Sequence, residues 1–130
     1  MRYPFKYIFL IISTLFIFAT SSYAQVTQSW LEENYHKSEV MIPMRDGISL
    51  YTAVYSPVHA ERRPVIITRT PYSCAPYGDG WHSDLTGNMS EFVQNEYIVV
   101  YQDVRGRFMS GGEFKNVRPY NPDKQGAQTD

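Results

Sequence analysis

Two apolar runs, each followed by a polar segment rich in turn residues, constrain the fold of this chain more than any other feature. The first run is Val65–Ile67, which leads into Arg69–Tyr72, and the second is Tyr97–Tyr101, which leads into Gln102–Gly106. Unbroken β-rich runs are typical of strands buried on both faces of a parallel sheet. Open α/β sheets place their ligand sites at the carboxyl ends of such strands. The sequence therefore predicts two buried strands with a candidate site where they end.

The segment between the two runs predicts how the strands are connected. Residues 70–87 form a long loop rich in Pro, Gly, Ser and Asp, and long loops between buried elements are usually functional. Residues 89–95 then predict a short helix that Asn88 or Ser90 caps, with Phe92 and Val93 facing the sheet. A strand, loop, helix, strand order favours a right-handed crossover between parallel strands.

An antiparallel hairpin is expected before these strands. Residues 39–44 and 48–55 are strand-like, and Asp46 and Gly47 between them form a strong turn signal because Gly accepts a positive φ. Residues 25–37 are polar with a few apolar residues at helix-like spacing, which we interpret as an N-terminal arm docked on the fold. The predicted fold class is α/β, with an antiparallel β-hairpin leading into a parallel βαβ unit.

Residues 1–24 have the pattern of a secretory signal peptide. Arg2 and Lys6 flank a charge-free apolar run over residues 8–18, and Ser22-Tyr23-Ala24 places small residues at the positions that a signal peptidase reads. The run is shorter than the roughly 20 apolar residues of a membrane span, which disfavours the alternative of a transmembrane anchor. We expect cleavage between Ala24 and Gln25, export to the periplasm or the medium, and no stable membrane anchor afterwards.

The net charge, the histidines and the single cysteine argue against nucleic-acid binding and against a metal site. Without Arg2 and Lys6, the chain carries ten basic residues against thirteen acids, a formal charge of −3, and it has no basic stripe for nucleic acid. Three histidines (His36, His59 and His82) lack metal-ligand spacing, so we interpret them as surface or loop residues. The single cysteine, Cys74, is interpreted as a small buried apolar residue.

Four segments together resemble the hydrolase group that contains the X-Pro dipeptidyl-peptidases, the α-amino-acid ester hydrolases and the cocaine-esterase-like acylases. The segments are Met44–Tyr51 (MRDGISLY), Arg69–Tyr72 (RTPY), Tyr101–Gly106 (YQDVRG) and Ser110–Phe114 (SGGEF). The resemblance covers about residues 38–120. It implies that residues 38–130 are the N-terminal portion of an α/β-hydrolase fold, incomplete because the chain stops before a nucleophile.

The resemblance also implies a serine hydrolase that uses a Ser–Asp–His triad on small-molecule esters or amides, or on short peptides. It implies neither a metal nor an organic cofactor. In that group the tyrosine of the RTPY segment lends its hydroxyl to the oxyanion hole, and the matching position is Tyr72. The nucleophile motif G-x-S-x-G is absent from the sequence. We therefore expect the serine, the acid and the histidine beyond Asp130, and no activity from these 130 residues alone.

Several alternatives stay open at this stage. Tyr72 could instead pack beneath its loop. For Asp103 and Arg105 we prefer a structural role, in which they pair with each other or bond to loop amides. The alternative is that Arg105 binds a substrate carboxylate. His82, beside Trp81, could be a plain loop residue or could face the substrate. The alternative function is a small secreted, non-catalytic module that binds a glycan or a peptide. The exact substrate and the oligomeric state are undetermined.

Overall fold

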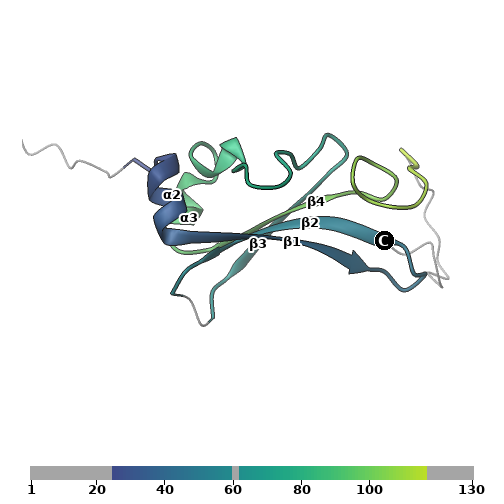
Figure 1. Ribbon diagram of the computed structural model, residues 1–130, viewed down its shortest axis with the longest axis horizontal. Helices are drawn as coiled ribbons and strands as arrows, with labels where there is room; N and C mark the ends of the chain where they lie inside the picture. The colour runs from purple at the N-terminus through teal and green to yellow at the C-terminus, as the bar shows by residue number, and fades with distance from the viewer. Residues whose placement is uncertain (1–24, 60–61, 117–130) are drawn as a thin grey trace, which may run out of the picture.

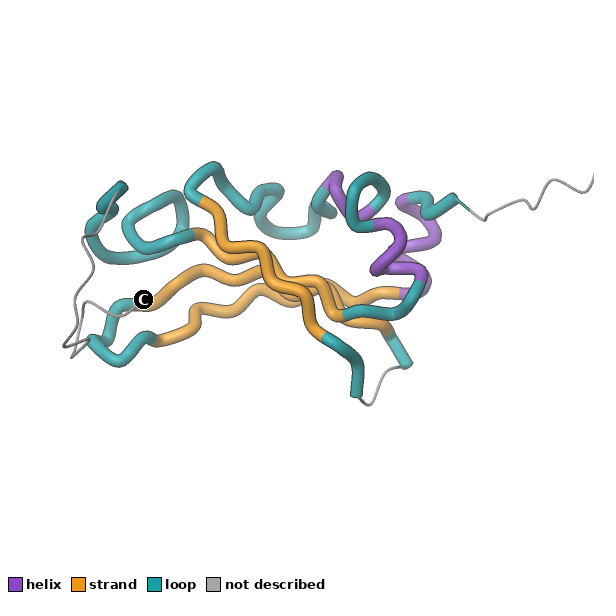
Figure 2. Tube along the Cα trace, turned by 180° about the vertical axis from the view of Figure 1, so that it is seen from behind, coloured by secondary structure: helices purple, strands orange, loops and turns teal. Residues whose placement is uncertain are grey.

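The computed structural model describes residues 25–59 and 62–116, which form one four-stranded sheet covered on one side. The sheet order is β1-β2-β4-β3, with β1 (Tyr35–Pro43), β2 (Ser49–Pro57), β3 (Val65–Thr70) and β4 (Ile98–Asp103). The helices α2 (Gln28–Asn34) and α3 (Ser90–Gln94) and the 3₁₀ turn η1 (Ser83–Leu85) complete the element set. Both helices and the long connection after β3 lie on the same side of the sheet (Figures 1 and 2). The predicted signal peptide lies outside the described residues.

The first two strands form the predicted antiparallel hairpin. They pair from Tyr35↔Pro57 to Pro43↔Ser49. Gly47 has φ +81°, a value that L side chains rarely adopt, and its N–H donates to the Met44 carbonyl at 3.0 Å. The hairpin prediction is confirmed, and β1 begins four residues earlier than expected because the strand continues directly from α2.

The predicted N-terminal arm is a docked helix. The Thr27 hydroxyl accepts the Trp30 N–H at 3.2 Å and caps α2. Leu31 is fully buried, and the Tyr35 hydroxyl after the helix donates to the Val93 and Tyr97 carbonyls, each at 2.9 Å. Burial raises the pKa of Tyr35 to about 12, so it remains a donor at neutral pH.

The second half forms the predicted parallel pair, with one correction. β3 and β4 pair in parallel from Val65↔Ile98 to Thr70↔Asp103. β4 is buried as expected, but β3 alternates, and Val65 and Ile67 are 60% and 54% exposed. The prediction that β3 is buried on both faces is therefore wrong for the described part of the chain. β3 is the last strand in the order, and no described element lies against that face.

The short helix α3 begins without the predicted cap. Its N-cap is Met89, which has no side-chain hydrogen bond, so the prediction that Asn88 or Ser90 caps the helix is wrong. The Met89 and Ser90 amides instead donate to the Asp84 and Gly87 carbonyls at 2.8 and 3.0 Å. The preceding turns therefore satisfy the first two amides of this helix entry.

One aromatic-rich core joins the sheet to the layer above it. Val93 of α3 is buried there as predicted, whereas Phe92 is half-buried with its ring edge-on to Tyr97 at 5.3 Å. The fully buried members of the core cluster come from α2, β2, the long loop, η1, α3 and β4: Leu31, Ala53, Tyr55, Cys74, Leu85, Val93 and Val99. Within residues 25–59 and 62–116, no helix has the length and apolarity to cross a membrane.

Candidate active site

The carboxyl ends of β3 and β4 lie next to each other, as their parallel pairing requires. The last paired residues, Thr70 and Asp103, are direct partners, and the Val104 N–H continues the ladder to the Thr70 carbonyl at 3.1 Å. Two loops leave from this edge: residues 71–82 after β3 and residues 104–114 after β4. The structure therefore brings the RTPY and YQDVRG segments together, as predicted.

Tyr72 stands at the start of the first loop with its side chain in the open. It is 85% exposed, so the alternative that it packs beneath the loop is wrong. Its backbone N–H donates to the Thr70 hydroxyl at 3.0 Å. The next residue, Ser73, has φ +89°, a left-handed conformation that is uncommon outside glycine. A tight, bonded turn thus presents an exposed phenol at the end of β3.

Asp103 ties this loop to the sheet. Its carboxylate is fully buried and accepts the Cys74 N–H and the Tyr77 hydroxyl, both at 2.9 Å, and the Met109 N–H at 3.3 Å. The prediction that Asp103 bonds loop amides is confirmed. Burial raises the pKa of the Cys74 thiol and of the Tyr77 hydroxyl to about 12, and the Asp103 charge adds to both. Cys74 is therefore a protonated core residue, as predicted, rather than a thiolate nucleophile.

Arg105 has a structural partner that the sequence analysis did not foresee. Its guanidinium forms a two-point ion pair with Asp46, at 2.8 Å and 3.2 Å, which ties the end of β4 to the hairpin turn. The alternative that Asp103 and Arg105 pair with each other is wrong, because Asp103 accepts from loop donors and Arg105 pairs with Asp46, whereas the structural role predicted for both residues is confirmed. The hydrogen bond from Arg105 holds the pKa of Asp46 below its ordinary value. Gly106 follows with φ +66°, and a Cβ there would meet the Phe114 amide nitrogen at 2.1 Å, so only glycine fits.

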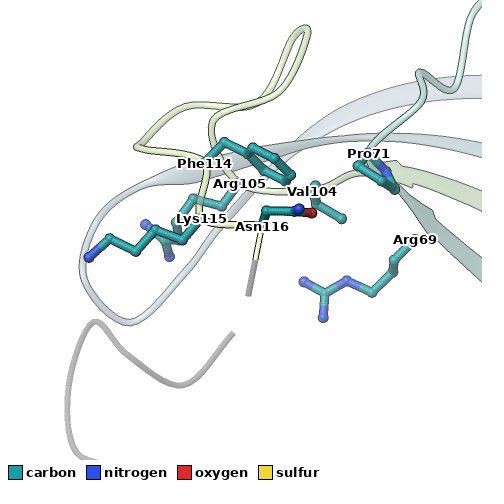
Figure 3. Close-up of a pocket in the computed structure, with 7 residues that line it drawn as sticks. All are labelled: Arg69, Pro71, Val104, Arg105, Phe114, Lys115 and Asn116. Carbon is teal, nitrogen blue, oxygen red and sulfur yellow. The ribbon is translucent and has the colours of Figure 1, made fainter. Parts of the chain in front are cut away.

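A pocket of about 350 Å³ opens beside this edge (Figure 3). Seven residues line it: Arg69, Pro71, Val104, Arg105, Phe114, Lys115 and Asn116. Three of the seven are cationic and none is acidic. In Figure 3 the Arg69 guanidinium extends from the end of β3 below Asn116 and Val104. The pocket therefore has a positive bias, which the ion pair between Arg105 and Asp46 reduces.

His82 packs against the core and not against the turn that carries Tyr72. Its ring stacks on Tyr101 with centroids 3.9 Å apart and 7° between the planes, and its Nδ1 accepts the Asp84 N–H at 3.3 Å. Burial lowers its pKa. This contact gives His82 a packing role. His36 and His59 are exposed, and the described ranges contain no group of three or more potential metal ligands.

Sequence reasoning missed two cations that organise the loop. The Arg107 Nε donates to the Pro71 carbonyl at 3.0 Å, directly before Tyr72. The Lys37 ammonium donates to the carbonyls of Pro76 and Gly80 at 2.9 and 2.7 Å, and also to that of Gly78. No local pattern marks Lys37, since its partners lie about forty residues away in the chain.

Comparison with known proteins identifies the family. A family model described as X-Pro dipeptidyl-peptidase (S15 family) matches residues 46–129. The cocaine esterase of Rhodococcus sp. (strain MB1 Bresler) is 44% identical over 77 residues, which are 59% of this chain and 13% of the esterase.

Two solved structures share the fold. An α-amino acid ester hydrolase is 34% identical with a TM-score of 0.59, over 81% of this chain and 18% of that one. An aminopeptidase from the marine sediment archaeon Thaumarchaeota archaeon is 29% identical with a TM-score of 0.63, over 87% of this chain and 20% of that one. The chain thus spans between 13% and 20% of the length of these relatives. Its sheet is part of an α/β-hydrolase fold, and the chain belongs to the X-Pro dipeptidyl-peptidase (S15) family.

Proposed function

We propose that this chain supplies the oxyanion-stabilising part of an exported serine hydrolase that cleaves ester or amide bonds in small molecules or short peptides. The family membership supports hydrolysis over the alternative of a glycan- or peptide-binding module. The relatives are an esterase, an ester hydrolase and an aminopeptidase, which together favour acyl transfer at a carbonyl carbon.

In the proposed mechanism the serine Oγ attacks the carbonyl carbon while a histidine accepts the serine proton. The carbonyl π electrons move onto oxygen, and the Tyr72 hydroxyl donates a hydrogen bond to that oxygen beside one backbone N–H. The histidine then protonates the leaving group, and water releases the acyl group in a second addition. The serine, histidine and acid of this triad are the residues expected beyond Asp130.

The observation that carries the proposal is the presentation of Tyr72. Its phenol is 85% exposed at the carboxyl end of β3, on a loop whose backbone is bonded immediately before and after it. A hydroxyl that projects from a fixed backbone can be aimed at a substrate with little reorganisation, which is the requirement for electrostatic stabilisation of a transition state.

Tyr72→Phe in the full-length protein tests the proposal, because it removes only the donor. With a p-nitrophenyl ester as substrate, kcat should fall roughly ten- to a thousandfold, the range that follows loss of one oxyanion donor, while KM changes little. Tyr97→Phe is the matched control, since it removes a hydroxyl at the opposite end of β4 and should leave kcat unchanged. A folded Tyr72→Phe enzyme with wild-type kcat would overturn the assignment.

Export is the second part of the proposal and has its own test. The leader pattern of residues 1–24 predicts a mature protein that begins at Gln25. N-terminal mass spectrometry of the protein expressed with its leader in a bacterial host should find Gln25 as the first residue. An intact Met1 in the folded product would contradict export by this route.

A further inference from the structure

The peptide group that joins Pro71 to Tyr72 is bonded at both of its polar atoms. Its N–H donates to the Thr70 hydroxyl at 3.0 Å, and its carbonyl oxygen accepts from the Arg107 Nε, also at 3.0 Å. The proline ring fixes φ of residue 71. The plane of this peptide, and with it the direction in which the Tyr72 Cα–Cβ bond leaves the backbone, is therefore set by two side chains.

The backbone after Tyr72 is held as well. The Cys74 N–H donates to Asp103 at 2.9 Å, and the Tyr77 hydroxyl donates to the other oxygen of the same carboxylate at 2.9 Å. Residues on both sides of Tyr72 are thus fixed to the end of β4 and its loop. Only the side-chain torsions of Tyr72 remain to orient its hydroxyl.

Arg107 is itself held in place. Its guanidinium carbon lies 5.1 Å from the Phe108 ring centroid and 5.0 Å from that of Phe114. Its backbone N–H donates to Val104 at 3.1 Å, and its carbonyl accepts the Ser110 N–H at 3.0 Å. A side chain packed against two rings on a hydrogen-bonded loop has few alternative rotamers, so it can define a position for the group that it contacts.

We propose that Arg107 is a positioning residue for Tyr72: through the Pro71 carbonyl it fixes the peptide from which the oxyanion-stabilising phenol projects. This inference rests on the proposed function of Tyr72. Its physical basis is that a displacement of about 1 Å in a reacting group can lower a rate roughly a hundredfold. Arg107 acts through the hydrogen bond from its Nε to the Pro71 carbonyl, and the positive charge of the guanidinium strengthens that bond.

A pair of matched variants separates the hydrogen bond from the charge. In Arg107→Gln the amide nitrogen sits as far along the side chain as Nε, so the donor is kept and the charge is lost. In Arg107→Met a methyl group takes that position, so both are lost. In the full-length enzyme, Arg107→Met should lower kcat by about tenfold or more with KM nearly unchanged, and Arg107→Gln should stay within about threefold of wild type. Equal losses in the two variants would overturn the inference.

The double variant with Tyr72→Phe shows whether Arg107 acts through Tyr72. Adding Arg107→Met to Tyr72→Phe should cost less than about twofold more in kcat, because no hydroxyl is left to misplace. Multiplicative losses would overturn the positioning role while leaving the proposed function intact. Tyr72→Phe with full activity would instead overturn the proposed function itself, so the two failures are distinguishable.

Thr70 gives an independent route if Arg107→Met does not fold. Thr70→Val removes the acceptor for the Tyr72 N–H with almost no change in shape, and Thr70→Ser keeps it. The valine variant should lower kcat without changing KM, and the serine variant should not. Wild-type kcat in a folded Thr70→Val enzyme would contradict the requirement for a fixed peptide at this position.

Discussion

The loop after β3 is held by two buried charges of opposite sign, one bonded to the backbone near Tyr72 and to the Tyr77 hydroxyl, the other bonded to the backbone of residues 76–80. The end next to Tyr72 is held by Asp103 of β4, which accepts hydrogen bonds from the loop; we call this set, Asp103 with Cys74 and Tyr77, the Asp103 clamp. The far end is held by Lys37 of β1, which donates to the carbonyls of Pro76, Gly78 and Gly80; this set is the Lys37 clamp.

The two clamps differ in how deeply the charge is buried. Asp103 is fully buried, whereas the Lys37 side chain is 8% exposed and forms a 2.8 Å ion pair with Glu39, whose side chain is 30% exposed. Burial is the largest influence and raises the pKa of Glu39, but the hydrogen bonds from Lys37 and the Gly78 amide, together with the Tyr51 hydroxyl and the Lys37 charge, lower the net pKa. Water can reach the Lys37 clamp if it is broken, but it cannot easily reach the Asp103 clamp.

The two clamps should therefore differ in their effects on activity and on stability. The Asp103 clamp fixes backbone two residues from Tyr72, and its loss should affect both activity and stability. The Lys37 clamp holds residues 76–80, four or more positions from Tyr72, and its loss should affect stability alone. The same loop is thus fixed for catalysis at one end and for folding at the other.

Asp103→Asn should have the largest effect. The asparagine amide has one acceptor oxygen where the carboxylate has two. At least one of the buried donors that Asp103 binds therefore loses its acceptor and meets the amide NH₂ group instead. We expect the free energy of unfolding to fall by about 3 to 5 kcal/mol, because two or more buried hydrogen bonds to a charged acceptor, each worth about 1.5 to 3 kcal/mol, are weakened or lost, and we expect kcat to fall with it. Urea denaturation of the full-length protein measures the change. Asp79→Asn, which changes an exposed carboxylate in the same loop, is the control. A loss of unfolding free energy below about 1 kcal/mol in Asp103→Asn would contradict the claim that the Asp103 clamp stabilises the fold more than the Lys37 clamp does.

Lys37→Met should have an intermediate effect on stability and almost none on catalysis. The methionine keeps the buried stem but leaves three loop carbonyls and Glu39 without their donor. We expect a loss of about 1.5 to 3 kcal/mol, since water can replace part of the lost bonding, and a kcat within about threefold of wild type. Arg62→Met removes an exposed cation and serves as the control. A drop in kcat as large as that of Asp103→Asn would remove the distinction between the two clamps.

Substitution of His82, which follows the Lys37 clamp in the chain, should have the smallest effect on stability. We expect it to change only how the free energy of unfolding depends on pH. Because burial lowers its pKa in the folded state, the unfolded chain binds the proton more readily, and stability must fall as pH falls below the ordinary value near 6.5. One proton limits this loss to less than about 1 kcal/mol between pH 7 and pH 6. His82→Phe keeps a ring on Tyr101 and should flatten that part of the unfolding profile. An unchanged slope would assign the pH dependence to other groups.

Local patterns predicted the elements well and the contacts between them poorly. Asp46 and Gly47 predicted the hairpin turn because Gly47 needs a positive φ, a property of one residue and its neighbours. Two expectations about partners failed: Arg105 pairs with Asp46 rather than with Asp103, and the N-cap of α3 makes no side-chain hydrogen bond. Partner choice depends on which groups the fold brings together, and residue spacing does not encode it.

The burial of β3 was mispredicted for a related reason. The apolar run Val65–Ile67 correctly indicated a strand, but its burial depends on what covers both faces of the sheet. Among the described residues, α2, α3 and the long loop all lie on one side, so Val65 and Ile67 remain exposed. A run of β-branched residues indicates that a strand favours burial. It does not indicate which helix or loop covers each face of that strand.

The sequence by itself determined the antiparallel hairpin, the parallel pair of β3 and β4, the family and the place of Tyr72 after β3, because these follow from periodicity, turn chemistry and the RTPY and YQDVRG segments. The antiparallel pairing of β2 with β4 came only from the tertiary structure. Tertiary structure alone decided that Tyr72 is exposed, that Arg107 and Asp103 fix the backbone around it, and that Lys37 reaches the far end of the same loop. Side chains from three separate strands and loops converge there, and the cost of leaving buried charges and amides unpaired selects their partners only once the chain has folded.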